Sequence, residues 1–285
     1  MKKAIVTGST GLLGRTVVKY LISKSIDVLC VGRKKLSTAN MLEIFKSKVD
    51  YIQLPMERIG DLNNKIINYN WSIGSDCVFY NFAWGGKGSL TNGSFQDQLD
   101  NSIYSAEAVK IAKEMGCIKF INCGTLEETF AEQHLQKKIN TPFISTQTNY
   151  AIAKLASRDM CKIFSYLNKI DYIHTRLSLP LPQNLNSKSY VSKTLKNIFL
   201  GKKFDVPKNN RLFDVIFFDD VAEAYYLIGL HGKNKKDYFI GTSKPITLNE
   251  YFNIIKKISA RNKVKKIPKL KNKASSFFSI NELQR

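Results

Sequence analysis

Short apolar segments alternate with amphipathic segments through the first half of the chain. The apolar segments that predict β-strands cover residues 3–7, 26–31, 51–54, 76–83, 118–123 and 171–177. Apolar side chains at helical spacing predict amphipathic helices over residues 15–23, 42–47, 99–115 and 149–167. Because alternating strands and helices build parallel sheets with helices on both faces, the predicted fold class is α/β, a Rossmann-type doubly wound parallel sheet.

The pattern changes after Pro182, where loops lengthen and Asn and Lys become more frequent. Helices are predicted over residues 219–230 and 249–259, and short extended segments over residues 238–240 and 246–248. We therefore predict an NAD(P)-binding Rossmann domain over residues 1–180, to which segments near 211–245 return. Residues 181–285 are predicted to form a smaller C-terminal substrate lobe with a basic end segment.

Composition narrows the class of protein. The chain has 285 residues, 44% of them hydrophobic, which is enough for the core of one large domain or of a main domain with a small appendage. No apolar run is long enough to cross a bilayer, and Thr7 and Gly8 interrupt the first one too early for a signal peptide. Five scattered cysteines without a Cys-x-x-Cys pair predict buried thiols in a reducing compartment. We therefore expect a cytoplasmic protein without membrane insertion. The three histidines are widely separated in the sequence, so we assign no metal site.

The formal net charge of +21 admits three interpretations: a nucleic-acid binder, a lysine-rich solvated surface, or an enzyme with polyanionic substrates. The basic residues are spread over the whole chain, with one denser stretch at residues 256–273, and no signature of a nucleic-acid-binding module is present. A small polyanion such as a nucleotide diphosphate is therefore favoured over nucleic acid as the partner. Solvated charge is the simplest role for the stretch at 256–273.

Three glycines follow the first predicted strand and open the first predicted helix, in Thr7-Gly8-Ser9-Thr10-Gly11-Leu12-Leu13-Gly14. Gly8 permits a tight turn, Gly11 lets a pyrophosphate approach the backbone, and Gly14 allows the helix to pack closely on the strand. Free amides and the helix dipole at the start of the helix favour phosphate. A flexible turn is the alternative, but the position between strand and helix favours dinucleotide binding. The predicted cofactor contacts in this loop are Gly8, Thr10, Gly11, Leu12, Leu13 and Gly14.

The end of the second predicted strand bears on the choice of nucleotide, because an acidic residue there binds the ribose 2′-hydroxyl of NAD and a basic residue accommodates the 2′-phosphate of NADP. The strand ends in Gly32-Arg33-Lys34-Lys35, which contains no carboxylate. We predict that Arg33 binds the 2′-phosphate and that NADPH is the cofactor, with NAD as the alternative. A solvated basic turn would look the same in the sequence.

Tyr150 and Lys154 stand four residues apart in a predicted helix, which places both on one face. A free tyrosine titrates near pH ~10, and a nearby ammonium favours the phenolate and lowers the pKa. Tyr150 is therefore predicted to pass a proton to or from a carbonyl oxygen while a hydride moves at the carbon. Lys154 is predicted to hold the nicotinamide ribose as well.

The Gly-x-x-Gly-x-x-Gly spacing and the Tyr-x-x-x-Lys motif resemble the short-chain dehydrogenase/reductase superfamily, and the chain is similar to its extended branch over about residues 3–250. The resemblance implies that Thr125, at the end of the strand over 118–123, hydrogen-bonds the substrate carbonyl as the third catalytic residue. It also implies that the stretch Asn81–Gly86 lies beside the cofactor, with Ala83 in contact with the cofactor and Trp84 near the substrate.

Further positions match the extended branch, and others depart from it. Asn101 matches an asparagine that supports the active site, and Arg176 matches an arginine at the end of the sixth strand. Pro55-Met56-Glu57 stands at the end of the third predicted strand, where the family usually has an aspartate that contacts adenine. Phe213 replaces an arginine, and Arg211 is the predicted substitute as a ligand of the substrate diphosphate.

The extended branch acts mostly on nucleotide-linked sugars, as epimerases, 4,6-dehydratases and 4-keto reductases. Similar dehydratases carry Thr-Asp-Glu, but this chain has Leu126 in the middle position. Glu127 alone cannot fill both acid–base roles, so a dehydratase is disfavoured. Glu127 is predicted to contact the substrate. The basic strand end favours a dissociable NADPH. We predict NADPH-dependent reduction of the 4-keto group of a nucleotide-activated deoxyhexose, a surface-polysaccharide precursor.

Two other functions remain open from the sequence. The first is a nucleotide-sugar 4-epimerase, which would hold NAD(H) tightly. The second is a non-catalytic cofactor-binding or nucleic-acid-associated protein, whose only support is the basic excess. The resemblance also implies a homodimer formed through the helices predicted over 99–115 and 149–167, with a nucleotide-diphosphate sugar as the small-molecule partner.

Overall fold

The computed structural model of the chain divides into two compact units. The first unit contains Met1–Arg176 and Ala222–Tyr238, and the second contains Leu177–Val221 and the chain from Phe239 onward. The residues that the structure describes are 1–67, 71, 74, 76–86, 91–136, 148–182, 189–206 and 212–260.

A seven-stranded sheet organises the first unit. Its strands are β1 (Lys3–Thr7), β2 (Asp27–Gly32), β3 (Asp50–Gln53), β4 (Cys77–Asn81), β5 (Lys119–Thr125), β6 (Asp171–Leu177) and β10 (Lys236–Ile240). They lie in the order β10-β6-β5-β4-β1-β2-β3, and the pairs from β3 to β5 are parallel. The strand order changes direction at β1, because β2 and β3 follow on one side of it and β4 to β6 on the other. Doubly wound sheets bind their ligands at such a point, next to the carboxyl ends of the strands. The predicted Rossmann-type fold is confirmed.

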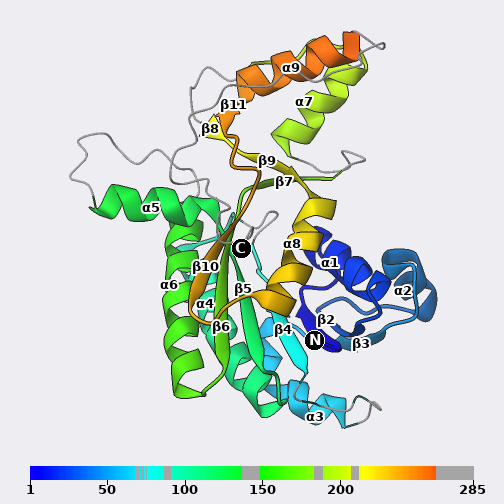
Figure 1. Cartoon of the computed structure of the whole chain (residues 1–285), viewed down its shortest axis with the longest axis vertical. Helices are drawn as coiled ribbons and strands as arrows, with labels where there is room; N and C mark the ends of the chain where they lie inside the picture. The colour runs from blue at the N-terminus through cyan, green and yellow to red at the C-terminus, as the bar shows by residue number, and fades with distance from the viewer. Residues whose placement is uncertain are drawn as a thin grey trace. The chain divides into compact units, whose positions relative to one another are not determined.

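Helices cover both faces of this sheet, and Figure 1 shows α4 and α6 side by side on one face and α1 on the other. Strand alternation explains the two layers: Ile5 of β1 joins the core with α4 residues such as Val109, while its neighbours project to the opposite face. There α1 buries Val17, Val18 and Leu21. The helical segments are α1 (Leu12–Ser23), α2 (Thr38–Phe45), η1 (Met56–Asp61), α3 (Leu62–Ile66), α4 (Phe95–Glu114), α5 (Leu126–Gln136), α6 (Thr148–Leu167) and α8 (Phe218–His231).

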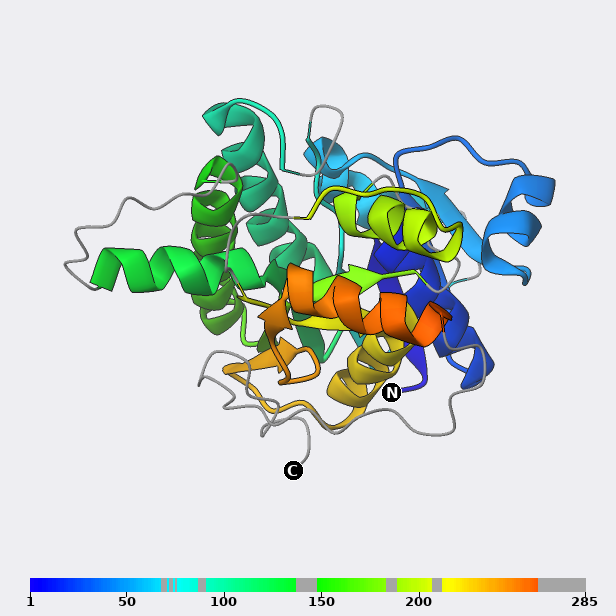
Figure 2. The ribbon, with the colours of Figure 1, turned by 90° about the horizontal axis from the view of Figure 1, so that it is seen from above.

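The second unit contains two small sheets and two packed helices. Its elements are β7 (Leu179–Leu181), α7 (Tyr190–Phe199), β8 (Leu212–Phe213), β9 (Val215–Phe217), β11 (Ile246–Thr247) and α9 (Leu248–Ala260). Strand β7 pairs with β9 in parallel, and β11 pairs with β8 in antiparallel orientation. Helix α7 lies along α9, as Figure 2 shows from above, and the two helices enclose a core that includes Leu195, Ile198 and Phe252.

The helices differ from the predicted ones in several respects: α2 and α4 begin four residues earlier than predicted, and η1, α3 and α7 were not predicted. Helix α1 begins at Leu12 instead of residue 15, because Gly11 is its N-cap and Leu12 already has helical geometry. Helix α5 was not predicted, although Thr125 and Glu128 form the two sides of a capping box that starts it: the Thr125 amide donates to Glu128 Oε1 at 2.7 Å, and the Glu127 amide donates to Thr125 Oγ1 at 3.4 Å.

All five cysteines are free and buried, as the sequence predicts. Each lies within the described part of the chain, and their thiols therefore serve as apolar packing groups. Among the described residues, no helix is long and apolar enough to cross a membrane.

Candidate active site

The glycine loop after β1 is shaped by its lack of Cβ atoms. Gly8 has a φ of +65°, and a Cβ atom there would lie 2.8 Å from the backbone nitrogen of Ala83. A Cβ atom at Gly14 would overlap the carbonyl oxygen of Gly8. The Gly11 amide donates to the Gly8 carbonyl at 2.9 Å and closes the turn. The loop is therefore held against β1 and the segment after β4 by contacts that only glycine allows.

The start of α1 is suited to an anion. Helices α2, α4 and α7 begin with Ser37, Ser94 and Ser189, whose side chains accept a bond from a first-turn amide. The N-cap of α1 is Gly11, which offers no such acceptor, and the first turn carries no acidic residue. The amides at this end therefore suit the phosphates of a dinucleotide. The structure thus brings the predicted cofactor residues of the loop together at one helix start.

The end of β2 lies beside this loop. A Cβ atom at Gly32 would lie 3.5 Å from Cγ2 of Thr10, which places the strand end next to the turn. Arg33 is exposed, and its carbonyl accepts a bond from Gln53 Nε2 at 3.3 Å. The Tyr51 hydroxyl donates to the carbonyl of Lys34. The turn backbone is therefore fixed from β3, while the Arg33 side chain is left in solvent.

Thr125, Tyr150 and Lys154 come together at the carboxyl end of β5. Thr125 is the last residue of β5, and its side chain lies close enough to Tyr150, in the first turn of α6, to act on the pKa of that tyrosine. Lys154 follows one turn later and is buried. Its Nζ donates to the carbonyl oxygen of Cys123 at 2.7 Å and lies 3.7 Å from the ring centroid of Trp84. The ammonium is thus held between a backbone carbonyl and an indole face.

The acid–base properties of Tyr150 differ from the expectation. Burial, more than any other cause, raises the pKa of Tyr150 above its ordinary value, the negative charge of Glu128 adds to the rise, and the Thr125 side chain opposes it. Burial likewise lowers the pKa of Lys154. The predicted lowering of the Tyr150 pKa is therefore wrong for this arrangement, because burial dominates and the Lys154 ammonium is bonded to Cys123 instead. The neutral phenol is the favoured form of Tyr150.

Trp84 forms a fixed wall of the same site. Its Nε1 donates to Gln98 Oε1 at 2.8 Å, and its ring meets the ring of Tyr150 edge-on at 5.9 Å between centroids. Asn101 holds the next residue from both sides, because its Oδ1 accepts the Gly85 amide at 2.6 Å and its Nδ2 donates to the Gly85 carbonyl. The supporting role that the resemblance implied for Asn101 thus has a concrete form, a clamp on the loop after β4.

The other residues singled out from the sequence are not all placed at the site. Leu126 is a buried leucine, so the position of the dehydratase aspartate offers no acid or base. Glu127 is half-buried beside Thr125. Arg211 lies outside the described residues. Arg176 is not at the candidate site by its contacts: it donates to Thr129 Oγ1 at 2.8 Å and to Glu132 Oε2 at 2.6 Å.

Sequence reasoning overlooked a buried polar chain behind the site. Thr7 Oγ1 donates to Asn81 Oδ1 at 2.7 Å, Asn81 Nδ2 donates to Asn122 Oδ1 at 3.0 Å, and Asn122 Nδ2 donates to Ser157 Oγ at 3.3 Å. This chain links β1, β4, β5 and α6 at the edge where the cofactor loop and Tyr150 lie. The available signal was a polar residue within or at the end of each of these apolar strands, because such residues need buried partners.

The fold and this constellation define a class of protein. A glycine loop at the reversal of a parallel sheet, with a Tyr–Lys pair and a threonine at the same strand edge, is the arrangement of a dinucleotide-dependent oxidoreductase. The chain belongs to the NAD dependent epimerase/dehydratase family, whose sequence model matches residues 4–241. The predicted membership of the extended short-chain dehydrogenase/reductases is confirmed, as is the prediction of an NAD(P)-dependent enzyme.

Known relatives differ in activity. A 2-alkyl-3-oxoalkanoate reductase of Shewanella oneidensis is 27% identical over 269 residues, covering 88% of this chain and 65% of the reductase, so the chain spans less than two thirds of that relative. A putative UDP-glucose 4-epimerase of Methanocaldococcus jannaschii is 25% identical over 263 residues, covering 88% of this chain and 81% of the epimerase. The solved UDP-glucose 4-epimerase of Thermotoga maritima with UDP-glucose matches with a TM-score of 0.72 at 17% identity, covering 99% of this chain and 91% of that one. This last likeness concerns the fold alone.

Proposed function

We propose that the chain reduces the 4-keto group of a nucleotide-activated deoxyhexose with NADPH, in the making of surface polysaccharide sugars. The observation that carries this proposal is the convergence of Thr125, Tyr150 and Lys154 at the end of β5. Burial raises the pKa of Tyr150, so its phenol stays protonated. A protonated tyrosine is ready to donate to a developing alkoxide, which a ketone reduction requires first. The similarity to a reductase of 3-oxoalkanoates supports reduction of a ketone in general.

The chain's own residues would bind and orient the reactants. The glycine loop and Ala83 would hold the dinucleotide, and Lys154 would contact its nicotinamide ribose; the bound nicotinamide supplies the hydride. Thr125 would orient the ketone oxygen, and Tyr150 would give that oxygen its proton. Leu126 excludes the acid–base pair that dehydration needs. The buried position of Lys154 next to Trp84 would keep water from this part of the site.

The direct test is NADPH oxidation against a panel of dTDP-, CDP-, GDP- and UDP-linked 4-keto-6-deoxyhexoses. We expect at least one member to be reduced, with the product keeping its nucleotide and losing its ketone. A 2-alkyl-3-oxoalkanoate belongs in the panel as a ketone without a nucleotide. Turnover of that compound alone would contradict the nucleotide-sugar part of the proposal and leave the ketone reduction standing.

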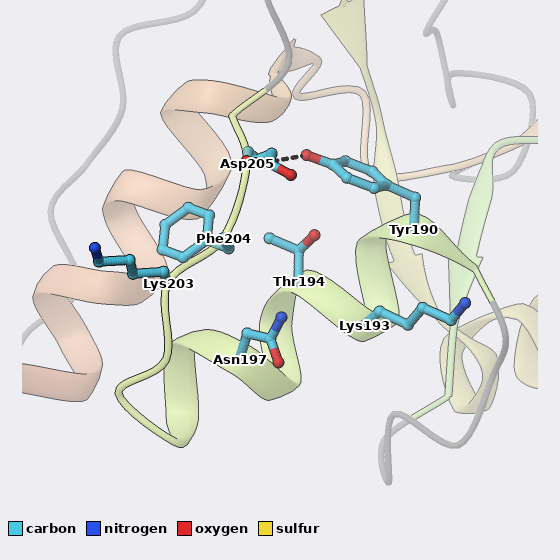
Figure 3. A pocket seen from close by; sticks show the side chains of 7 residues that line it. All are labelled: Tyr190, Lys193, Thr194, Asn197, Lys203, Phe204 and Asp205. Carbon is cyan, nitrogen blue, oxygen red and sulfur yellow. Dashed lines mark hydrogen bonds between the residues drawn. The ribbon is translucent and has the colours of Figure 1, made fainter.

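A hollow in the second unit has side chains that suit a nucleotide diphosphate. It has a volume of about 380 Å³ and lies between α7 and the following loop. Figure 3 shows its lining side chains, which are Tyr190, Lys193, Thr194, Asn197, Lys203, Phe204 and Asp205. Aromatic rings suit a nucleobase, amide and hydroxyl groups suit its polar edge, and two lysines suit a diphosphate. We propose this hollow as a nucleotide-binding pocket of the second unit.

Lys203→Ala is expected to weaken binding of the free nucleoside diphosphate by about 10-fold, because one phosphate contact is lost. Lys202→Ala is the matched control: the neighbouring lysine is exposed but does not line the hollow. Isothermal titration calorimetry with UDP, dTDP, CDP and GDP measures both variants. Equal losses for the two lysines would point to general charge instead of a defined pocket, and would count against this site.

We propose NADPH as the preferred cofactor, because the turn after β2 offers the exposed Arg33 and no carboxylate. Arg33→Asp is expected to lower the preference for NADPH over NADH by about 10- to 100-fold, since a charge-assisted bond to the 2′-phosphate is replaced by repulsion. Fluorescence titration with both cofactors measures the ratio. Lys162→Asp, an equal charge change on the exposed side of α6, controls for net charge. An unchanged ratio in Arg33→Asp would reject Arg33 as the selective residue.

A 4-epimerase is the second candidate, favoured by the similarity to a putative UDP-glucose 4-epimerase. An epimerase returns the hydride to the same sugar and therefore keeps its cofactor bound. Cofactor that copurifies with the chain and survives dialysis, together with sugar inversion without net NADPH oxidation, would favour this function over the reductase.

We further propose that the chain forms a homodimer through α4 and α6. These helices pack against each other and leave large apolar side chains exposed. The exposed residues are Phe95 and Ile103 on α4, and Ile152, Ile163, Phe164, Tyr166 and Leu167 on α6. Apolar groups concentrated on two neighbouring helices are typical of a surface that another chain covers.

A further inference from the structure

Glu128 and His174 form a fully buried pair directly behind the candidate catalytic strand end. Both side chains have 0% exposure, and Glu128 Oε2 lies 2.7 Å from His174 Nε2. A Cβ atom at Gly124 would overlap both side chains, so the pair packs against the backbone of β5. The carboxylate is ionised: burial acts to raise the pKa of Glu128, but His174, Lys154 and Arg176 together hold it below its ordinary value. His174 Nε2 is therefore the donor in this bond.

The Glu128–His174 pair and Lys154 both bind the backbone of one short segment, Cys123–Thr125, at different residues. The Thr125 amide donates to Glu128 Oε1 at 2.7 Å, and the Lys154 ammonium donates to the carbonyl of Cys123 at 2.7 Å. A carboxylate and an ammonium thus hold the strand end Cys123–Thr125 from α5 and α6. Through Thr125 this arrangement also reaches Tyr150.

A helix cap alone would not need this charge. Glu128 completes the capping box of α5, but glutamine serves that position as well as glutamate does. The neighbouring Glu132 on the same helix bonds Arg158 and Arg176, two partners that lead away from the strand end. The Glu128 carboxylate instead acts on the buried Lys154 ammonium, whose positive charge needs a negative charge nearby.

Because Lys154 is buried, it needs an opposite charge or strong hydrogen-bond acceptors nearby to stay protonated. An ammonium taken out of water loses its hydration, and it stays charged only with an opposite charge or strong acceptors nearby. The titratable groups that face Lys154 are Glu128 of α5, Cys123 of β5, and Tyr150 and Cys161 of its own helix, with His174 of β6 behind Glu128. Glu128 is the carboxylate of this set, and the cysteine thiols are neutral because burial raises their pKa.

We propose that Glu128, oriented by His174, is a positioning residue that keeps the buried Lys154 charged and fixes Thr125 against Tyr150. It acts through these groups and contacts no substrate itself. The inference rests on the proposed role of Lys154 in holding the cofactor, but it does not depend on which sugar is the substrate.

The test is the pH dependence of NADPH binding to the full chain, measured by fluorescence from about pH 7 to about pH 11. In the wild type, affinity is expected to fall at the pH where Lys154 loses its proton. Glu128→Gln keeps the cap but removes the attraction that favours the ammonium, so Lys154 loses its proton more readily. The fall in affinity is therefore expected about one pH unit lower, or more.

Glu132→Gln is the matched control, because it removes the same charge one helical turn further on. It is expected to leave the pH of the fall unchanged. Lys154→Met is expected to remove the pH dependence, and adding Glu128→Gln to it should change NADPH affinity no further. Equal shifts in Glu128→Gln and Glu132→Gln, an unchanged pH in Glu128→Gln, or a wild-type affinity without pH dependence would each overturn the inference. Failure of the sugar panel would leave this binding result intact, so the two proposals fail separately.

Discussion

Tyr150→Phe is expected to lower kcat for the ketone reduction by about 1000-fold, because the substitution removes the only proton that this side chain can give to the developing alkoxide. The aromatic ring remains, so its edge-on contact with Trp84 is kept. NADPH affinity and the melting temperature are therefore expected to stay near those of the wild type. Single-turnover NADPH oxidation with the best sugar of the panel measures the effect on chemistry apart from product release.

Tyr166→Phe provides the matched control for this prediction. Tyr166 lies on the same helix, but 70% of it is exposed at the end remote from Thr125. We expect this variant to turn over at the wild-type rate. A Tyr150→Phe enzyme with nearly full kcat would reject Tyr150 as the proton donor, whereas a simultaneous loss of NADPH binding would mean that the hydroxyl serves binding and not proton transfer.

Gly14→Ala is expected to destabilise the first unit by about 2–3 kcal/mol and to weaken NADPH binding by about 100-fold. The added Cβ would overlap the Gly8 carbonyl and lie 3.0 Å from Cα of Ser9, both of which are backbone atoms that cannot rotate away. Either the turn opens or α1 moves off β1, and both changes disturb the amides that face the phosphates. Thermal unfolding and fluorescence titration measure the two effects.

Gly60→Ala is the control for the loop, because a Cβ atom there would meet nothing within 4 Å. We expect no loss of NADPH affinity in that variant. Gly11→Ala should separate the two consequences further, since its Cβ would approach only the Gly8 carbonyl, at 3.1 Å. Lower affinity with little loss of stability is expected there. If Gly14→Ala binds NADPH as the wild type does, the loop is not the cofactor cradle.

Local signals in the sequence were sufficient for the framework of the first unit. The strands over 3–7 and 171–177 were predicted with the bounds that the structure has, since a short apolar run has few alternatives to a buried strand. Helix α5 was missed because its residues form no strong apolar stripe. Its start was nevertheless encoded locally, in the Thr125-Leu126-Glu127-Glu128 capping box.

For the candidate site, too, the positions of the residues were predictable and their environment was not. The spacing of Tyr150 and Lys154 placed both on one helix face, and the glycine spacing located the loop at α1, because both patterns depend on residues a few positions apart. The environment of the pair was not predictable from spacing. The structure buries Lys154 between Trp84 and the Cys123 carbonyl. It also buries Tyr150, and this burial raises the pKa of Tyr150 instead of lowering it as expected.

By itself, the sequence determined the fold class, the family and the positions of the glycine loop and the Tyr–Lys pair, because these follow from local periodicity and spacing. Only the tertiary structure decided which charges are buried together. Glu128 and His174 are 46 residues apart in the chain and meet only after α5 and β6 pack around the end of β5. Their pairing depends on burial and on contacts across the sheet, and no local pattern in the sequence carries that information.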